Sequence, residues 1–344
     1  MEPIYTRRQW LRLGSTAAGA AVLGGLTGCE KREHEGSAAP APANPVARST
    51  ANEQYVWLSA CANLPLFTLH DHPALRLAAD ELGVQAVIAG PNTVDIAGLV
   101  TAIEQTTAQK PAGMMVVGWD PSALVPAING AVDRGIPVVC VDADVPASKR
   151  LCFIGTDWFE LGVRQAEAMV RAVAGRKGRV ALLGHTDQEI DQRAFAGFRS
   201  IAQQHGLDCL EPQHDKGNTA EATRVAAAII QGTPELVGIA GFDSESGPGI
   251  GQAIKESRKV GQIVGTCVEA EEAHLRLLKE GALSACIGQK RELFTYYGLR
   301  VLFDLVHARL HLTKDDARAG VRPIPSSINT GSYTVTRDNL SAFL

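Results

Sequence analysis

The sequence predicts an α/β protein made of two doubly wound parallel-sheet domains joined by a hinge. Three observations lead to this fold class. Short apolar or β-branched runs alternate with longer segments whose apolar residues recur three or four positions apart. The short runs are apolar throughout, which is typical of parallel strands covered by helices on both faces. Nine such runs are too many for one sheet of ordinary size, so we expect two domains.

The chain begins with the features of an export signal over residues 1–29. Arg7 and Arg8 precede a weakly apolar stretch rich in glycine and alanine, which closes on Leu26-Thr27-Gly28-Cys29. The stretch is shorter than the roughly 20 apolar residues of a membrane span, so we expect it to be cleaved. The paired arginines resemble a twin-arginine signal and the last four residues resemble a lipobox, which predicts lipidation at Cys29.

Residues 30–52 are rich in Ala, Pro, Ser and charge and have no apolar period, so we expect a flexible tether. The first domain is then expected over 53–156 plus 290–320, and the second over 157–289 plus 321–344. The net charge of -4 gives no basic field for nucleic acid.

The expected strands follow from the continuous apolar runs, and the expected helices follow from apolar residues three or four positions apart. The expected strands are Tyr55–Ala60, Gln85–Ala89, Gly113–Val117, Pro137–Val141, Leu151–Gly155, Arg179–Gly184, Leu236–Ala240, Gln262–Thr266 and Ala282–Ile287. The clearest helical segments are 73–83, 95–109, 124–135, 220–231 and 271–281, several of which end at glycine.

In doubly wound sheets, ligands bind at the carboxyl ends of the strands. The residues that follow the predicted strands are mostly carboxylates, amides and aromatics rather than the glycines of a nucleotide site. The candidates for a ligand-binding site are Asn63, Phe67, Trp119, Asp142, Asp144, Arg193, Phe242, Asp243, Glu269 and Gln289.

The order of these motifs resembles the periplasmic sugar-binding proteins of the ribose-binding type, which have the type 1 periplasmic-binding fold. Asn63, Pro65 and Phe67 form the loop after the first strand, and Asp142 in GIPVVCVDAD matches the family's ligand carboxylate. In DQRAFAGF, Arg193 stands at the ligand-arginine position, and Gln289 in ACIGQ matches a hinge-side glutamine.

The sequence departs from that pattern at three strand ends. Ala143 stands where many ribose-type members have arginine, with Asp144 as the candidate to replace it. Phe242 stands where asparagine is common, and GTC with Glu269 two residues on replaces GFD at the end of the expected strand Gln262–Thr266. These departures argue against ribose itself as the ligand.

The candidate residues suit a sugar or polyol. Carboxylates accept hydrogen bonds from hydroxyls, arginine and amide side chains donate, and an aromatic ring covers the apolar face of a sugar. For each acid the alternative is a solvated loop or a helix N-cap; for Arg193 it is a surface salt bridge. Trp119 is alternatively a shield for a strand end.

Other classes of site find less support. Gly247-Pro248-Gly249-Ile250-Gly251 has the wrong spacing for a dinucleotide fingerprint. His70-Asp71-His72 and the pair His307 and His311 offer metal ligands without a nearby third partner, so we predict neither metal nor cofactor. His185-Thr186-Asp187 lacks a nucleophile, and a saccharide-modifying enzyme would need two acids across a glycosidic bond, so we predict no enzyme.

Six cysteines accompany Cys29, and none forms a CxxC pair. We expect buried thiols, with one disulfide as the alternative because the compartment is oxidising. The sequence therefore predicts a lipid-anchored, monomeric solute-binding protein on the outer side of the cytoplasmic membrane or in the periplasm, which delivers a sugar to an ABC permease. The alternative is a receptor that signals ligand occupancy to a chemotaxis or histidine-kinase partner.

Overall fold

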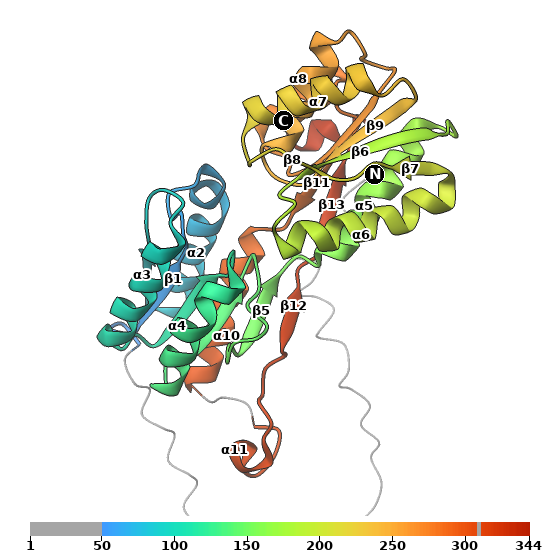
Figure 1. The fold of residues 1–344 in the computed structure, drawn as a ribbon. Helices are drawn as coiled ribbons and strands as arrows, with labels where there is room; N and C mark the ends of the chain where they lie inside the picture. Colours follow the sequence, from blue (N-terminus) through green and yellow to red (C-terminus); the bar gives the residue numbers. More distant parts are fainter. Residues whose placement is uncertain (1–49, 308–310) are drawn as a thin grey trace, which may run out of the picture. The chain divides into compact units, whose positions relative to one another are not determined.

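Two open sheets, each covered by helices on both faces, organise the computed structural model, which describes residues 50–307 and 311–344 (Figure 1). Both domains lie within one compact part of the chain, Ser49–Leu344. The predicted signal peptide, Cys29 and nearly all of the predicted tether lie outside the described residues. The two-sheet α/β architecture predicted from the sequence is confirmed.

The first domain is built on a six-stranded parallel sheet. In spatial order its strands are β12 (Ser327–Asn329), β5 (Cys152–Gly155), β4 (Val138–Val141), β3 (Gly113–Val117), β1 (Gln54–Leu58) and β2 (Gln85–Ala89). Alternate residues of β1 explain the two-sided cover: Tyr55 and Trp57 pack in one apolar cluster, and Val56 and Leu58 pack in the other.

Helices of the first domain divide between these two clusters. The faces are covered by α2 (His72–Leu82) with α10 (Glu292–His307), and by α3 (Ile96–Gln109) with α4 (Pro121–Asp133). Helix α2 follows directly on the π-helical turn η1 (Phe67–Asp71). Gly83 ends α2 in the left-handed conformation, and Asp95 and Asp120 cap α3 and α4 through their carboxylates.

The second domain has a sheet of the same kind with one antiparallel edge. Its strands in order are β13 (Ser332–Val335), β11 (Ala285–Gln289), β10 (Val264–Val268), β9 (Leu236–Gly241), β6 (Gly178–Gly184) and β7 (Leu207–Cys209), and β8 (Gln213–His214) also pairs with β6. Strand β13 runs antiparallel to β11. The parallel prediction therefore holds for every described strand pair except this edge.

Two apolar clusters also flank the second sheet. They are formed on one side by α5 (Trp158–Val173) and α6 (Glu189–Ala202), and on the other by α7 (Thr219–Gly232), α8 (Ser246–Glu256) and α9 (Glu272–Glu280). Three short helices complete the described chain: η2 (Gln203–His205), α11 (Asp316–Ala319) and η3 (Leu340–Ala342).

The chain passes between the domains three times, after β5, after β11 and after β12. The predicted boundary at residue 321 needs correction, because β12 pairs with β5 in the first sheet. The last crossing therefore lies at Thr330-Gly331. Strands β7, β8, β12 and β13 were not predicted, because edge strands of two to four residues with mixed polarity carry no continuous apolar run.

Candidate functional site

The candidate site centres on a buried guanidinium beside the second crossing. Arg291, two residues beyond β11, is 3% exposed. It donates to Asp71 from Nε (3.1 Å) and to Asp142 from Nη1 (2.9 Å), and its Nη1 lies 4.0 Å from Glu269 Oε1. These acids come from η1 and from the ends of β4 and β10, so one cation joins three carboxylates from both domains.

Asp142 and Glu269 occupy equivalent places in the two sheets. Each follows the last residue of a buried strand, and each has φ of +68°. This left-handed conformation is uncommon for residues with a side chain, and such residues concentrate at functional sites. Both side chains are nearly buried and turn toward Arg291.

The charges of this cluster are unequal. Burial opposes the charge of Arg291, but Asp142, Asp71 and Glu269 outweigh burial and raise its pKa. Burial raises the pKa of Asp71 to about 7, with Arg291 opposing the rise and Asp142 adding to it. Burial likewise raises the pKa of Glu269, against Arg291 and the amide of Gln289. The cluster nevertheless places three carboxyl groups around one guanidinium, so its oxygen atoms outnumber the groups that donate to them.

Gln289 completes the polar cluster. Its amide nitrogen donates to Glu269 Oε1 at 2.6 Å, while its own Oε1 is buried and has no hydrogen-bond partner among the described residues. A buried amide oxygen without a donor costs free energy, so this oxygen is available to accept a further hydrogen bond.

Two aromatic rings lie against this cluster. Phe67 and Trp119 stack with centroids 5.6 Å apart and planes at 26°, and Arg291 lies 5.2 Å from the Phe67 centroid. The indole nitrogen of Trp119 donates to Asp142 Oδ2 at 3.2 Å. Trp119 is thus held beside the proposed ligand carboxylate.

A cavity of about 340 Å³ adjoins Trp119, at the low end of the roughly 300–1,000 Å³ typical of small-molecule pockets. Its lining includes Asp144 and Arg150 of the first domain and Asp157, Gln188 and Arg193 of the second. The two domains therefore both contribute polar groups to one cavity.

Both charged candidates in this cavity have partners of their own. Arg150 donates to Asp144 from two nitrogens, at 2.6 and 2.5 Å, so Asp144 carries a bidentate salt bridge. Arg193 lies 3.4 Å from Asp157, the N-cap of α5, and about half of its side chain is exposed. Asp144 and Arg193 therefore lie together in the cavity, but apart from the Arg291 cluster.

Three of the residues predicted from the sequence have partners other than the Arg291 cluster. Asn63 is exposed and donates to Asn92 Oδ1 at 2.6 Å. Phe242 is fully buried in the core of the second domain, where it meets Phe195 and Phe198 edge to face, which corrects its expected place in the ligand-binding site. Asp243 accepts from the backbone N–H groups of Ser246 and of Glu245, the N-cap of α8, so its carboxylate supports the turn that begins this helix.

Arg291 and the pairing of Asp71 were not predicted from the sequence. Asp71 belongs to His70-Asp71-His72, which suggested metal ligands, but in the structure it pairs with Arg291. His72 packs edge to face on Trp57. A usable signal existed for Arg291: it stands two residues beyond the hinge-side glutamine, where the chain enters the first domain again.

His70 joins the domains next to the cluster. Its Nε2 lies 2.9 Å from Glu271, which precedes α9, and its Nδ1 lies 2.7 Å from Glu292, which begins α10. Hydrogen bonds to Glu271 and then Glu292 raise the pKa of His70 to about 10, against the effect of burial. His70 is therefore a cation at neutral pH that links two acids.

The six cysteines of the described chain are free, and five are buried. The Sγ atoms of Cys267 and Cys286 lie 3.6 Å apart on neighbouring strands. The expectation of buried thiols therefore holds for all but Cys209, which is partly exposed.

Across residues 50–307 and 311–344, no helix combines the length and the apolar character that crossing a membrane requires.

Comparisons with known proteins give a consistent result. The sequence model of the family described as periplasmic binding protein domain matches residues 62–309. The ribose import binding protein of Bacillus subtilis (strain 168) is 23% identical over 232 residues, covering 67% of this chain and 74% of that protein.

Two solved structures are also similar. A sugar ABC transporter (sugar-binding protein) from Bacillus halodurans has a TM-score of 0.79 and 27% identity, covering 85% of this chain and 100% of that one. An arabinose-binding protein from Geobacillus stearothermophilus has a TM-score of 0.75 and 30% identity, covering 85% and 99%.

Proposed function

Because this chain belongs to the periplasmic binding protein family, we propose that it captures a monosaccharide or sugar-like polyol between its two domains and delivers it to an ABC importer. The relatives named above are described as ribose import, sugar ABC transporter and arabinose-binding proteins, which supports both the ligand class and the transport role. Binding without catalysis is part of the proposal.

One observation carries the ligand class. The unpaired Oε1 of Gln289 and the carboxylates of Asp142 and Glu269 form a set of acceptors at the domain junction. Trp119 and Phe67 place aromatic rings beside them, as a sugar ring with hydroxyls on its edge and apolar C–H groups on its face requires. A sugar hydroxyl that donates to Gln289 Oε1 would remove an unfavourable buried group.

The cavity beside Trp119 supplies a second group of contacts in this proposal. Arg193 is held by Asp157 over a longer distance than Asp144 is held by Arg150, and its guanidinium is half exposed. Arg193 is therefore free to donate to a ligand with little loss of existing contacts. We propose Asn63 only as an outer contact, because it is exposed and already paired with Asn92.

The proposal is tested by calorimetry on the full chain carrying Cys29→Ser, titrated with pentoses, hexoses and sugar alcohols. We expect a saturable heat with one ligand per chain. Absence of binding across the panel at millimolar concentration would refute the sugar proposal.

Two variants then locate the site. Asp142→Asn should weaken binding more than about tenfold, because a charge-assisted hydrogen bond contributes about 1.5–3 kcal/mol. Arg193→Ala, at a half-exposed position that should not disturb folding, should also weaken binding. Asp133→Asn, on an exposed salt bridge with Lys149, is the matched control and should bind as the parent does.

We also propose that Cys29 carries a lipid and that residues 30–52 tether the binding domains to the membrane, with the protein acting as a monomer in the periplasm or at the outer face of the cytoplasmic membrane. The lipobox-like Leu26-Thr27-Gly28-Cys29 supports this. Fractionation of cells that express the parent chain and Cys29→Ser tests it. The parent should partition with membranes and the variant with the soluble fraction; equal partitioning would refute the anchor.

A further inference from the structure

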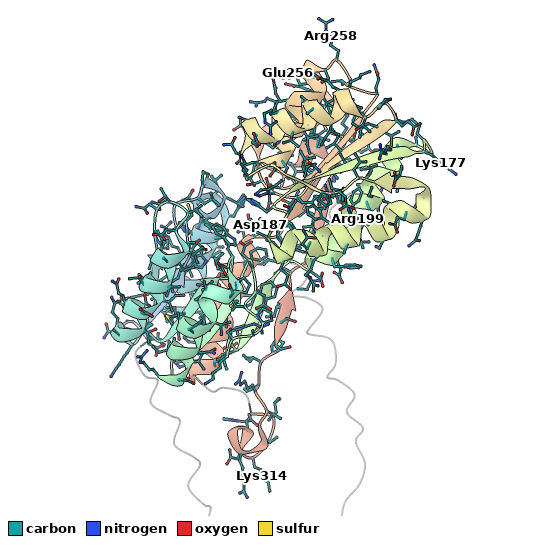
Figure 2. The ribbon with its side chains drawn as sticks, in the orientation of Figure 1. Lys177, Asp187, Arg199, Glu256, Arg258 and Lys314 are labelled. Atoms are coloured by element: carbon teal, nitrogen blue, oxygen red, sulfur yellow. The ribbon has the colours of Figure 1, made fainter. Side chains whose placement is uncertain are left out.

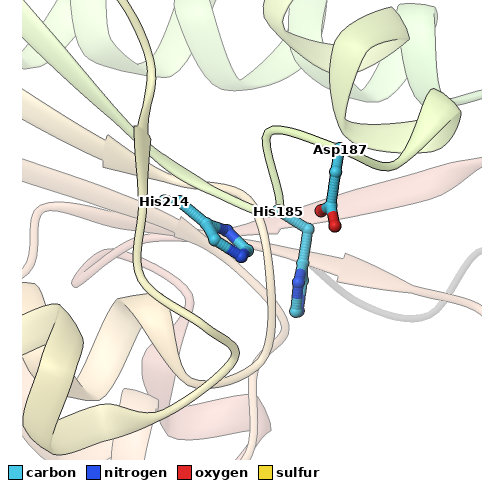
Figure 3. Close-up of side chains that lie close together, drawn as sticks. All are labelled: His185, Asp187 and His214. Carbon is cyan, nitrogen blue, oxygen red and sulfur yellow. The ribbon is translucent and has the colours of Figure 1, made fainter.

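Two imidazoles and a carboxylate converge in the second domain, outside the Arg291 cluster (Figure 3). His185 and Asp187 follow β6, and His214 ends β8, which pairs with β6. One ligand atom from each residue lies within 4.8 Å of the other two, and the imidazole centroids are 5.4 Å apart. Figure 2 shows Asp187 at the end of this domain opposite Lys177 and Arg258, so the group stands at the carboxyl ends of the strands.

The hydrogen bond of His214 prepares the imidazole to bind a metal ion. Its Nδ1 lies 3.2 Å from the carbonyl oxygen of Gly184. A carbonyl only accepts, so Nδ1 carries the proton and Nε2 keeps its lone pair. A backbone carbonyl that holds the other ring nitrogen in this way is the usual surrounding of a metal-binding histidine.

Two buried carboxyl side chains lie behind these three residues. Asp191 and Asp215 are 2% and 0% exposed, and Asp215 accepts hydrogen bonds from the Gly217 N–H and the Ser246 hydroxyl. Asp191 Oδ1 is buried without a hydrogen-bond partner. It lies so close to Gly184 that a Cβ added there would be 2.9 Å away, which places it beside the residue that holds His214. A nearby cation would lower the free-energy cost of ionising these buried carboxyl groups.

The loop after β8 leaves room at His185. Gly217 has φ of +56°, and a Cβ at that position would lie 2.7 Å from His185 Nε2. Any larger residue would therefore push the imidazole away. The loop on the other side continues from Asp187 into Gln188 and Glu189, which line the cavity between the domains.

We propose that His185, Asp187 and His214 bind one divalent transition-metal ion, with Zn²⁺ as the best-matched probe. Two imidazole nitrogens and one carboxylate oxygen form a ligand set that binds Zn²⁺ in preference to Mg²⁺ or Ca²⁺. Zn–N bonds of about 2.0–2.1 Å put tetrahedral ligand atoms about 3.4 Å apart, so rotamer changes of roughly 1 Å complete the site. Three protein ligands leave a fourth position for water or another oxygen donor. This site does not depend on the identity of the sugar.

The test uses the untagged full chain carrying Cys29→Ser, freed of metal by a chelator and titrated with Zn²⁺ by calorimetry. Absorption of the Co²⁺-substituted chain reports the geometry. We expect one ion per chain and a tetrahedral Co²⁺ spectrum. His214→Ala and Asp187→Asn should each weaken affinity more than about tenfold, since even losing a supporting partner of a ligand costs about 10- to 100-fold.

His205→Ala is the matched control, because it removes an exposed imidazole from the same domain away from the group. It should leave affinity and stoichiometry unchanged. Absence of stoichiometric binding at micromolar metal, or equal affinity in His205→Ala and His214→Ala, would overturn the proposal. Asp187 is exposed, so Asp187→Asn keeps the test decisive if His214→Ala folds poorly. The same variants are also titrated with sugar, so that a failure of the metal proposal can be distinguished from a failure of the proposed sugar site.

Discussion

At the scale of single residues, two acids at equivalent strand ends define how the domains meet. Asp142 and Glu269 both have a left-handed backbone and both face Arg291. Neither conformation is favoured by the residue type, so the surrounding contacts must compensate for the strain. The arrangement supports the proposed binding of hydroxyl groups, and it makes Arg291 the residue on which the cluster depends.

Arg291→Met should lower the free energy of unfolding by about 3–5 kcal/mol, because it leaves Asp71, Asp142 and Glu269 buried without their cation. Urea unfolding at neutral pH measures the change. Arg224→Met is the control, because Arg224 pairs with Glu221 on the surface and should contribute less than about 1 kcal/mol. Similar losses in both variants would show that the buried ion pairs contribute no more to the free energy of unfolding than the surface pair does.

His70 should make the free energy of unfolding fall as the pH rises above neutral. Its pKa rises from 6.5 unfolded to about 10 folded, so the folded state binds more protons between these values. The contribution of His70 is complete below pH 6.5 and is lost as the pH rises through about 10. Comparing urea unfolding of the parent chain and His70→Gln from pH 6 to 10.5 tests this. The gap between them should shrink with rising pH; a constant gap would contradict the assignment.

At the scale of elements, α5 and α6 pack closely enough to bring backbone against backbone. A Cβ added at Gly162 of α5 would lie 2.0 Å from the carbonyl oxygen of Ala194, and one at Gly197 of α6 would lie 2.1 Å from that of Phe159. Glycine is required at both positions because of this approach. The contact also positions Arg193, which lies between Ala194 and the cavity-lining start of α6.

Gly162→Ala should therefore lower the free energy of unfolding by about 3 kcal/mol, since the helices must separate and disturb their shared core. Gly130→Ala is the matched control inside α4, where the nearest atom is the flexible guanidinium of Arg134 at 3.7 Å. It should raise stability by up to about 1 kcal/mol, because alanine favours helix. Chemical denaturation of both variants decides; destabilisation of equal size would contradict the packing argument.

At the scale of the whole described chain, three crossings join the domains and three groups of contacts span the junction. These are the Arg291 cluster, the His70 bridge and the cavity that holds Arg193. Charged contacts make up the Arg291 cluster and the His70 bridge, whereas the cavity is also lined by apolar side chains such as Phe153 and Trp158. Such a junction allows hinge movement and can be strengthened by a ligand that touches both sides.

A sugar at about 100 times its Kd should raise the free energy of unfolding by about 2.7 kcal/mol, because only the state with both domains folded binds it. Trp158→Phe offers a domain-specific probe, since the other described tryptophans, Trp57 and Trp119, lie in the first domain. With ligand, tryptophan fluorescence of this variant and circular dichroism should give the same urea midpoint. Separate midpoints in saturating ligand would place the sugar on one domain only.

The sequence alone predicted the two-domain α/β fold, because continuous apolar runs and 3.6-residue periods are local signals that parallel sheets impose on every strand. It also indicated Asp142, Glu269 and Gln289, since strand ends follow directly from strand positions. Only the tertiary structure decided which of these side chains meet. Phe242 lies in a core and Asp243 accepts from backbone N–H groups at the start of α8, although both follow a strand as Asp142 does.

Arg291, Asp71 and the edge strands were likewise decided by tertiary contacts. Arg291 and Asp71 stand 220 positions apart in the chain, and their pairing depends on η1 and the start of α10 being brought together. Strands β12 and β13 form because the chain returns to the edge of each sheet and offers backbone groups to it, and their own sequences carry little apolar pattern. Periodicity is a property of neighbouring residues, whereas ion pairs and edge-strand pairs form only when distant segments of the chain meet.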